Sequence, residues 1–201
     1  MNKQREIHNN YQRDIFAEEV SEFCVPIPEE IQRRLESIVA KVGLTQGEQV
    51  LDVGTGTGVL IPYIRSYALD SIVGCDISPT MLAEAARRHP DLSFWCGDVV
   101  DLPADLGPFD VVFLNAMFGN VWDQQQTLTK ATALLNPGGR ICISHPLGSR
   151  YVAELRRSDP ERTPHTLPDR EVFSEWLGLL PLELIYYEDG EVLYLAVLRK
   201  V

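Results

Sequence analysis

The sequence has few cysteines and a deficit of basic residues, and both features narrow the classes of protein to which it can belong. Its 201 residues include 4 cysteines, and no two of these have the C-x-x-C spacing of zinc ribbons or thioredoxin-like redox sites, so we expect no metal. Lysine and arginine number 18 against 29 acidic residues, for a formal net charge of -11. Such an acidic chain repels phosphate backbones and anionic lipids, so we expect neither a nucleic-acid nor a membrane partner.

Long apolar runs are also missing. No stretch approaches the roughly 20 consecutive apolar residues of a membrane-spanning helix. The first eight residues are polar and charged, unlike the apolar segment of a secretory signal, so a cytoplasmic location is expected. Arginines gather between 150 and 162, but acidic residues are interleaved with them. Cys75, Cys96 and Cys142 lie in apolar runs, where we expect buried, reduced thiols.

The length suits a single α/β domain over 1–201. Its hydrophobic periodicity divides it into an N-terminal helical cap (1–45), a core of alternating strands and helices (49–144) and a closing segment (145–201). Strands are expected at 49–53, 71–75, 92–96, 109–114, 140–144, 182–187 and 191–198. Helices are expected at 7–23, 28–42, 59–67, 81–88, 124–135, 149–157 and 169–180. Alternating strands and helices predict a doubly wound, mostly parallel seven-stranded sheet, and Asp189-Gly190 predicts an antiparallel C-terminal hairpin.

A glycine-rich loop is the first functional signal. Gly54, Gly56 and Gly58 follow an apolar strand and precede a helix. Glycine permits positive φ angles and lets a ligand approach the backbone closely. In the dinucleotide fingerprint G-x-G-x-x-G the third glycine would stand at position 59, where this chain has Val59. The loop therefore predicts a nucleoside site without identifying a dinucleotide.

Acidic residues follow the next two strands. Asp76 ends the second strand, and Asp98 comes directly after the third. Ligands of open parallel sheets bind beyond the carboxyl ends of the strands. A carboxylate there can accept hydrogen bonds from both hydroxyls of a ribose, so the pattern predicts an adenosine that lies across three strand ends.

Five segments in this order resemble the class I S-adenosylmethionine-dependent methyltransferases: Val50–Gly58, Gly74–Ser78, Cys96–Val99, Phe109–Phe113 and Leu135–Arg140. The resemblance covers about 49–144. It implies a Rossmann-like fold and S-adenosyl-L-methionine as the cofactor.

The resemblance also implies roles for individual residues. Asp52 and Gly54 would face the methionine part, Asp76 would bind the ribose hydroxyls, and Asp98 would face the adenine amino group. The alternatives are structural: a cap of the loop for Asp52, a helix-capping turn for Asp76 and a surface turn for Asp98. The complete set of expected cofactor residues is Asp52, Gly54, Thr55, Gly56, Asp76, Ile77, Met81, Gly97, Asp98, Val99 and Asn115.

Methyl transfer requires alignment of the acceptor with the methyl group, and some acceptors also need a base. His145 directly follows the fifth strand, at the expected active edge, and is the candidate base; its alternative is a hydrogen-bonded loop residue. Asn115, after the fourth strand, is the second candidate catalytic residue. Candidate substrate-binding residues are Tyr11, Phe118, His145, Tyr151 and His165, for which packing within the protein is the alternative.

The acceptor is the least constrained part of the prediction. Enzymes that methylate nucleobase or glutamine nitrogens carry an Asn/Asp-Pro-Pro-aromatic motif after the fourth strand, and this chain has Asn-Ala-Met-Phe there. The acidic charge and small size favour a small-molecule acceptor. A protein methyltransferase, a thiol or metalloid methyltransferase and a non-catalytic cofactor-binding protein remain alternatives, and both a monomer and a homodimer remain open.

Overall fold

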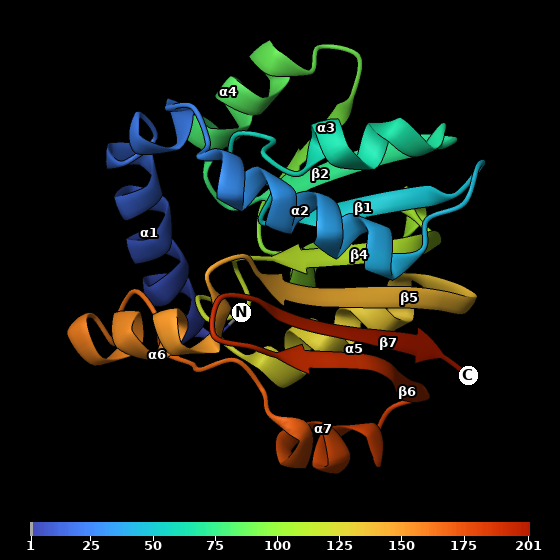
Figure 1. The fold of residues 1–201 in the computed structure, drawn as a ribbon. Helices are drawn as coiled ribbons and strands as arrows, with labels where there is room; N and C mark the ends of the chain where they lie inside the picture. Colours follow the sequence, from blue (N-terminus) through green and yellow to red (C-terminus); the bar gives the residue numbers. More distant parts are fainter. Residues whose placement is uncertain (1) are drawn as a thin grey trace.

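A sheet of seven strands runs through the computed structural model, which describes residues 2–201 (Figure 1). The strand order is β3-β2-β1-β4-β5-β7-β6. Neighbours among β1 to β5 pair in parallel, whereas β7 is antiparallel to both β5 and β6. This confirms the predicted sheet and its C-terminal hairpin. The strands are β1 Gln49–Val53, β2 Ser71–Asp76, β3 Ser93–Cys96, β4 Phe109–Asn115, β5 Leu135–His145, β6 Leu182–Asp189 and β7 Tyr194–Lys200.

Helices cover both faces of the sheet, as expected when parallel strands are joined by helical crossovers. One apolar core lies between the sheet and side chains of α2 and α3, and the other lies between the sheet and side chains of α5, α6 and α7. Each described helix is too short or too polar to cross a membrane. The helices are α1 Lys3–Glu18, α2 Glu29–Val42, α3 Ile61–Ile64, α4 Pro79–Arg88, α5 Gln124–Leu134, α6 Gly148–Ser158 and α7 Arg170–Leu177.

Several helix ends follow the local signals in the sequence. Ser78 precedes α4, and its Oγ accepts a hydrogen bond from the amide of Met81 at 3.4 Å. The carboxylate of Asp169 caps α7 in the same way. Gly43 ends α2 in the left-handed conformation, with φ at 70°. The caps at Gly43 and Asp169 agree with the predicted end of α2 and start of α7, whereas α4 begins at Pro79, two residues before the predicted start.

The N-terminal helix differs from its prediction. It spans Lys3–Glu18 rather than 7–23, and a separate 3-10 turn, η1, follows at Glu22–Cys24. Its buried side chains are Arg5 and Gln12, whereas Ile7 is 60% exposed. The predicted apolar stripe therefore does not hold the helix. Polar contacts with distant segments hold the helix in place instead, and hydrophobic periodicity gives no information about such contacts.

Other boundaries and environments also needed correction. The helix expected at 59–67 is a short α3 followed by a 3-10 turn, Arg65–Tyr67, and β5 begins at Leu135, before the turn residues. Cys96 is exposed, because it ends the short edge strand β3. His89, expected at the surface, is 8% exposed and packs so closely on Gly58 that a Cβ there would lie 2.7 Å from its ring.

α1 lies beyond the carboxyl ends of the parallel strands (Figure 1). Its side chains contact Asp98 after β3, the backbone of Asn120 after β4 and the backbone of Arg162 after α6. The helix therefore covers the edge of the sheet where ligands of this architecture bind.

Candidate active site

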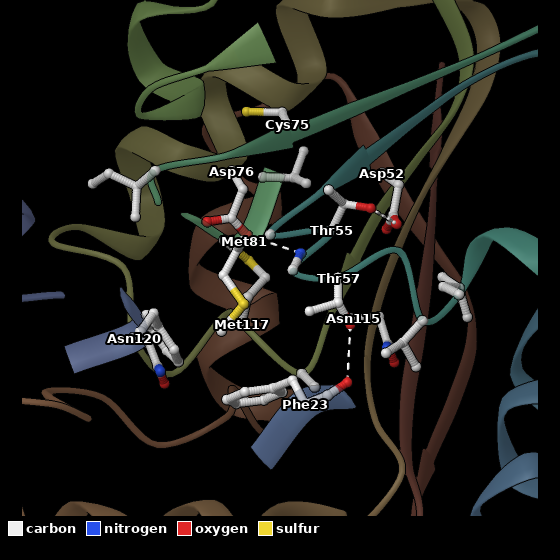
Figure 2. A pocket seen from close by; sticks show the side chains of 18 of the residues that line it. Phe23, Asp52, Thr55, Thr57, Cys75, Asp76, Met81, Asn115, Met117 and Asn120 are labelled. Atoms are coloured by element: carbon white, nitrogen blue, oxygen red, sulfur yellow. Dashed lines mark hydrogen bonds between the residues drawn. The ribbon is translucent and has the colours of Figure 1, made fainter. Parts of the chain in front are cut away.

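A cavity of about 490 Å³ opens at the carboxyl ends of β1, β2 and β4 (Figure 2). This volume lies in the range of small-molecule and cofactor sites. Its walls come from the glycine loop, the turns after β2, β3 and β4, one side of α1, and the segment from η1 into α2. The cavity therefore brings together segments that are more than a hundred residues apart in the sequence.

The glycine loop is tied to the neighbouring strand through its backbone. The amides of Gly54 and Thr55 donate to the carbonyl of Cys75 at 2.7 and 3.1 Å. Gly54 and Gly56 have φ angles of +66° and +54°, which favour glycine. A Cβ on Gly54 would lie 2.7 Å from Met117, whereas a Cβ on Gly56 would meet nothing within 4 Å. The loop is thus closely packed at Gly54 and open at Gly56, where it lines the cavity.

Asp76 joins the glycine loop to the start of α4. One carboxylate oxygen accepts the amide of Gly56 at 2.9 Å, and the other accepts the amide of Ser78 at 2.8 Å (Figure 2). Each oxygen keeps a lone pair for a ligand. Burial raises the pKa of this carboxyl, although the amides of Ser78 and Gly56 oppose the shift. Asp76 is therefore held in one orientation at the cavity.

Asp52 lies deeper in the site. It is 2% exposed, and its carboxylate accepts a hydrogen bond from the hydroxyl of Thr55 at 2.7 Å. Burial raises its pKa to about 7; the Thr55 bond lowers it, and the charge of Asp76 raises it. A cationic group of a ligand beside Asp52 would favour the ionised carboxylate.

Asp98 is bound from three directions. One oxygen accepts the amide of Val100 at 3.0 Å, and the other accepts Nε of Arg5 at 2.8 Å and Nδ2 of Asn9 at 2.9 Å. Arg5 also pairs with Asp101. The contacts from α1 were missed because nothing local in the sequence links a polar helix face to a carboxylate ninety residues away.

The expected cofactor residues converge on this cavity, with one exception. The exception is Gly97, whose amide donates to the carbonyl of Asp76 at 2.9 Å and so links the turn after β3 to the end of β2. The side chain of Asn115 is positioned by Ser144, whose hydroxyl donates to it at 2.9 Å. The residues that line the cavity are Asp52, Gly54, Thr55, Gly56, Asp76, Ile77, Met81, Asp98, Val99 and Asn115.

The expected catalytic histidine lies outside the cavity lining. The ring of His145 packs against Tyr151, with 5.4 Å between centroids, and its Nδ1 accepts the amide of Leu147 at 3.1 Å. Burial lowers its pKa to about 4, so the imidazole is neutral at physiological pH. The structure thus gives His145 the packed, hydrogen-bonded environment that was the alternative interpretation, whereas Tyr151 packs on the His145 ring but is 39% exposed.

The other expected substrate residues also lie outside the lining. Phe118 is 1% exposed and packs edge-to-face on Trp176. Nε2 of His165 is 3.1 Å from the carbonyl of Trp122. Tyr11 faces the loop after α6, where its hydroxyl contacts Asp159. The structure therefore does not bring these three side chains into the cavity lining.

Two groups of lining residues were not predicted. The first lies on α1 and consists of His8, Asn9 and Gln12. Phe16 of the same helix, which was expected as part of a lid over the cofactor or as a packed side chain, lines the cavity beside them. The second is the apolar segment Phe23–Leu35, from which Phe23, Val25, Pro26, Ile27, Pro28, Ile31 and Leu35 contribute. Its proline-rich, apolar character between two helices was the available signal, because such residues on an exposed loop are costly unless they cover something.

The charge of the lining is one-sided. In the described part of the chain, four carboxylates line the cavity, and neither lysine nor arginine does so. They are Glu22, Asp52, Asp76 and Asp98. The polar end at the sheet is thus suited to a cationic ligand, and the opposite end is apolar.

Residues 2–201 also contain no cluster of side chains suited to a metal ion.

Comparisons with known proteins agree with this geometry. Residues 50–139 match the family model described as a methyltransferase domain. The chain is 37% identical over 103 residues to a demethylmenaquinone methyltransferase of Beutenbergia cavernae, covering 51% of this chain and 42% of the relative. It is 32% identical over 120 residues to a trans-aconitate 2-methyltransferase of Variovorax paradoxus, covering 59% and 46%. The chain thus spans about half the length of the curated relatives it matches.

Solved structures show the same fold over nearly the whole chain. The magnesium protoporphyrin IX methyltransferase of Synechocystis, a structure with bound SAH, superposes with a TM-score of 0.72 at 17% identity. The match covers 96% of this chain and 100% of that one. The cap and the closing segment, outside the family match, are therefore part of a known arrangement.

Proposed function

Because the chain belongs to the class I S-adenosylmethionine-dependent methyltransferase family, we propose that it transfers the cofactor's methyl group to a small, largely apolar molecule. The observation that carries the proposal is the two-part lining of the cavity. Carboxylates and the glycine loop stand at the sheet edge, and an apolar wall with neither lysine nor arginine stands opposite, within residues 2–201.

The polar part suits the cofactor. S-adenosylmethionine supplies an electrophilic methyl group on a positively charged sulfur. Asp76 is proposed to accept the ribose hydroxyls through the lone pairs left by Gly56 and Ser78. Ile77 and Val99 would contact the adenine with Asp98 at its edge, and Asp52 would face the ammonium group. The open space at Gly56 fits a ligand that lies against the backbone.

The apolar part suits the acceptor. Side chains from Phe23 to Leu35 would bury its hydrocarbon and exclude water from the reacting atoms. A tricarboxylate, such as the substrate named for the Variovorax relative, would find no cationic side chain in the described lining. A quinone-like molecule, such as that named for the Beutenbergia relative, is closer to the chemistry of this wall. Asn115 is proposed to lie beside the transferred methyl.

Calorimetry with S-adenosylmethionine and its demethylated product tests the cofactor site. We expect Asp76→Ala to weaken binding of both at least about tenfold, which corresponds to about 1.4 kcal/mol. Asp110→Ala is the matched control, because Asp110 also accepts two hydrogen bonds, from the Gln49 amide and from Asn136, but lies outside the cavity lining. Absence of binding to the folded wild-type protein would refute the proposal.

A transfer assay then tests the acceptor class. The protein is incubated with radiolabelled cofactor and a cell extract, and the label is partitioned between organic solvent, water and precipitated protein. We expect label in the organic phase, and none from Asp76→Ala. Label in precipitated protein would instead support protein methylation, and cofactor binding without transfer would support a non-catalytic role.

A further inference from the structure

We propose that His8 is the general base of this methyltransferase and takes the proton from a hydroxyl group of an apolar, phenol-like acceptor. The inference rests on the proposed function and adds the class of reacting atom, an oxygen. Two observations support it: the position of His8 in the cavity lining, and the hydrogen bond that fixes the tautomer of its ring.

The hydrogen bond assigns the proton on the imidazole. Nε2 of His8 is 2.8 Å from the backbone carbonyl of Asn120. Asn120 itself lies in the cavity wall (Figure 2). A carbonyl oxygen accepts only, so Nε2 must carry the hydrogen. In a neutral ring the lone pair is then on Nδ1, which is the arrangement of a histidine ready to accept a proton. The ring also lies 5.7 Å from that of Trp122, which restricts its orientation.

The surroundings keep the ring neutral. Burial lowers the pKa of His8, and the nearby His165 lowers it further; the Asn120 carbonyl and the carboxylate of Asp98 act in the opposite direction. The net shift is below the ordinary value of a histidine. At neutral pH the ring is therefore mostly neutral, with its hydrogen on Nε2 alone, and its half-buried position leaves a route for the proton to solvent.

The other histidines do not meet these conditions. His145, His165 and His89 lie outside the cavity lining, and Nδ1 of His145 already accepts a backbone amide. His8 is thus the one histidine in residues 2–201 that lines the cavity. Lysine is absent from the described lining, and three of its four carboxylates gather around the polar part. The fourth, Glu22, is exposed to solvent, so His8 is the partly buried base available on the acceptor side.

The reaction balances with this base. A lone pair of the acceptor oxygen forms the new bond to the methyl carbon, the bond from that carbon to sulfur breaks, and its electron pair stays on sulfur as the neutral thioether. The hydroxyl proton passes to Nδ1 of His8 and from there to solvent. A base is needed because a hydroxyl is a weak nucleophile until its proton leaves.

Two phenols of different acidity test the inference. Naphthol is almost fully protonated at neutral pH and needs a base, whereas para-nitrophenol is already partly ionised. His8→Gln keeps a donor near the position of Nε2, for the Asn120 carbonyl, and removes the base. We expect its kcat for naphthol to fall about 10²-fold to 10⁴-fold, and its kcat for para-nitrophenol to fall much less. Glu6→Gln, which also removes a titratable group from α1 but at an exposed position outside the lining, should retain the wild-type rates.

Two further measurements distinguish failure of the His8 inference from failure of the proposed function. Calorimetry with the demethylated cofactor should give the same affinity for His8→Gln and wild type; failure of the wild type to bind would refute the proposed function itself. Nitrogen-15 NMR of the imidazoles should show His8 protonated on Nε2 with its pKa below the usual value. Equal naphthol rates in His8→Gln and wild type, or methylation of amines or thiols but of neither phenol, would overturn the inference.

Discussion

Nε of Arg5 in the N-terminal helix donates to the carboxylate of Asp98 after β3 at 2.8 Å, across 93 positions of sequence. The two side chains are 10% and 16% exposed. This pair holds α1 against the edge of the sheet, and with it the residues His8, Asn9 and Gln12, which line the cavity. The helix has no buried apolar side chain of its own, so its position depends on such polar contacts.

Arg5→Met should therefore release the helix. Loss of one partner leaves a largely buried carboxylate with fewer donors, which costs about 1–3 kcal/mol. We expect faster proteolytic cleavage within α1 and about tenfold weaker binding of the demethylated cofactor. Arg33→Met is the matched control, because Arg33 pairs with Glu29 on an exposed face of α2. Cleavage of α1 at the wild-type rate would contradict the role of the pair.

Gly54 and Gly56 both have positive φ angles but differ in the space around them, so alanine variants separate backbone strain from steric conflict. Gly54→Ala places a methyl group 2.7 Å from Met117, in addition to the cost of a positive φ, so we expect a loss of stability of about 2–4 kcal/mol. Gly56→Ala pays only the conformational cost of about 1–2 kcal/mol, because its Cβ meets nothing within 4 Å.

The two glycine variants should rank differently in cofactor affinity than in stability. The Cβ of Gly56→Ala enters the space assigned to the cofactor, so we expect calorimetry to show binding at least about tenfold weaker, despite the milder loss in thermal unfolding. Unchanged affinity in this variant would mean that the cofactor does not lie against the loop at that position.

Asp52 should make both stability and cofactor binding depend on pH. Its folded-state pKa is raised from 3.8 to about 7 by burial, so the protonated carboxyl stabilises the free protein at low pH. That contribution is lost as pH rises from about 4 to about 7. Asp52→Asn removes the titration while keeping an acceptor for the Thr55 hydroxyl. The melting temperature of the variant relative to wild type should therefore increase over this range.

Cofactor binding should change in the opposite sense. Only the ionised Asp52 attracts the cationic cofactor, so wild-type affinity should increase as pH rises through about 7. Asp52→Asn should bind about tenfold more weakly at pH 8 and lose most of this dependence. Asp76 also has a raised pKa, but it is present in both proteins, so the comparison isolates Asp52. Identical pH profiles would contradict the assignment.

The sheet could be predicted from the sequence because its signals are local. The apolar strands, the glycine loop and the Asp189-Gly190 turn each specify a short-range geometry, and connection rules for alternating strands and helices leave few topologies. Burial was harder to predict for short edge elements. In β3 the four-residue alternation does not show that Cys96 lies at an exposed edge.

The residues of the site differ in the same way: those placed by the sheet could be predicted from the sequence, and those placed by the docking of α1 could not. Asp52, Asp76 and Asp98 lie at or just beyond the carboxyl ends of neighbouring strands, so their convergence was predictable. His8 and Gln12 were not predictable, because their place in the cavity depends on how a polar helix docks across the sheet. His145 was favoured by its position at the carboxyl end of β5, but its ring packs on Tyr151 and lies outside the cavity lining.

Gln12 offers a last test of the acceptor side of the cavity. Its Nε2 donates to the carbonyls of Glu161 and Arg162 at 3.3 and 2.8 Å, which fixes the orientation of the amide. Within residues 2–201 its buried Oε1 has no partner, and an unpaired buried acceptor costs about 1–3 kcal/mol. Because Gln12 also lines the cavity, a donor on a bound molecule would satisfy this oxygen.

Gln12→Met should therefore raise the KM for a hydroxylated acceptor such as naphthol about fivefold to tenfold, since the lost bond is worth about 1–1.5 kcal/mol. The affinity for the demethylated cofactor should stay the same. Gln124→Met is the matched control, because Gln124 is also buried and donates to two backbone carbonyls, those of Phe118 and Thr166 at 2.9 Å, but lies outside the lining. A KM change of equal size in both variants would show that the effect comes from local destabilisation. A change in cofactor affinity with the KM unaltered would place Oε1 on the cofactor instead of the acceptor.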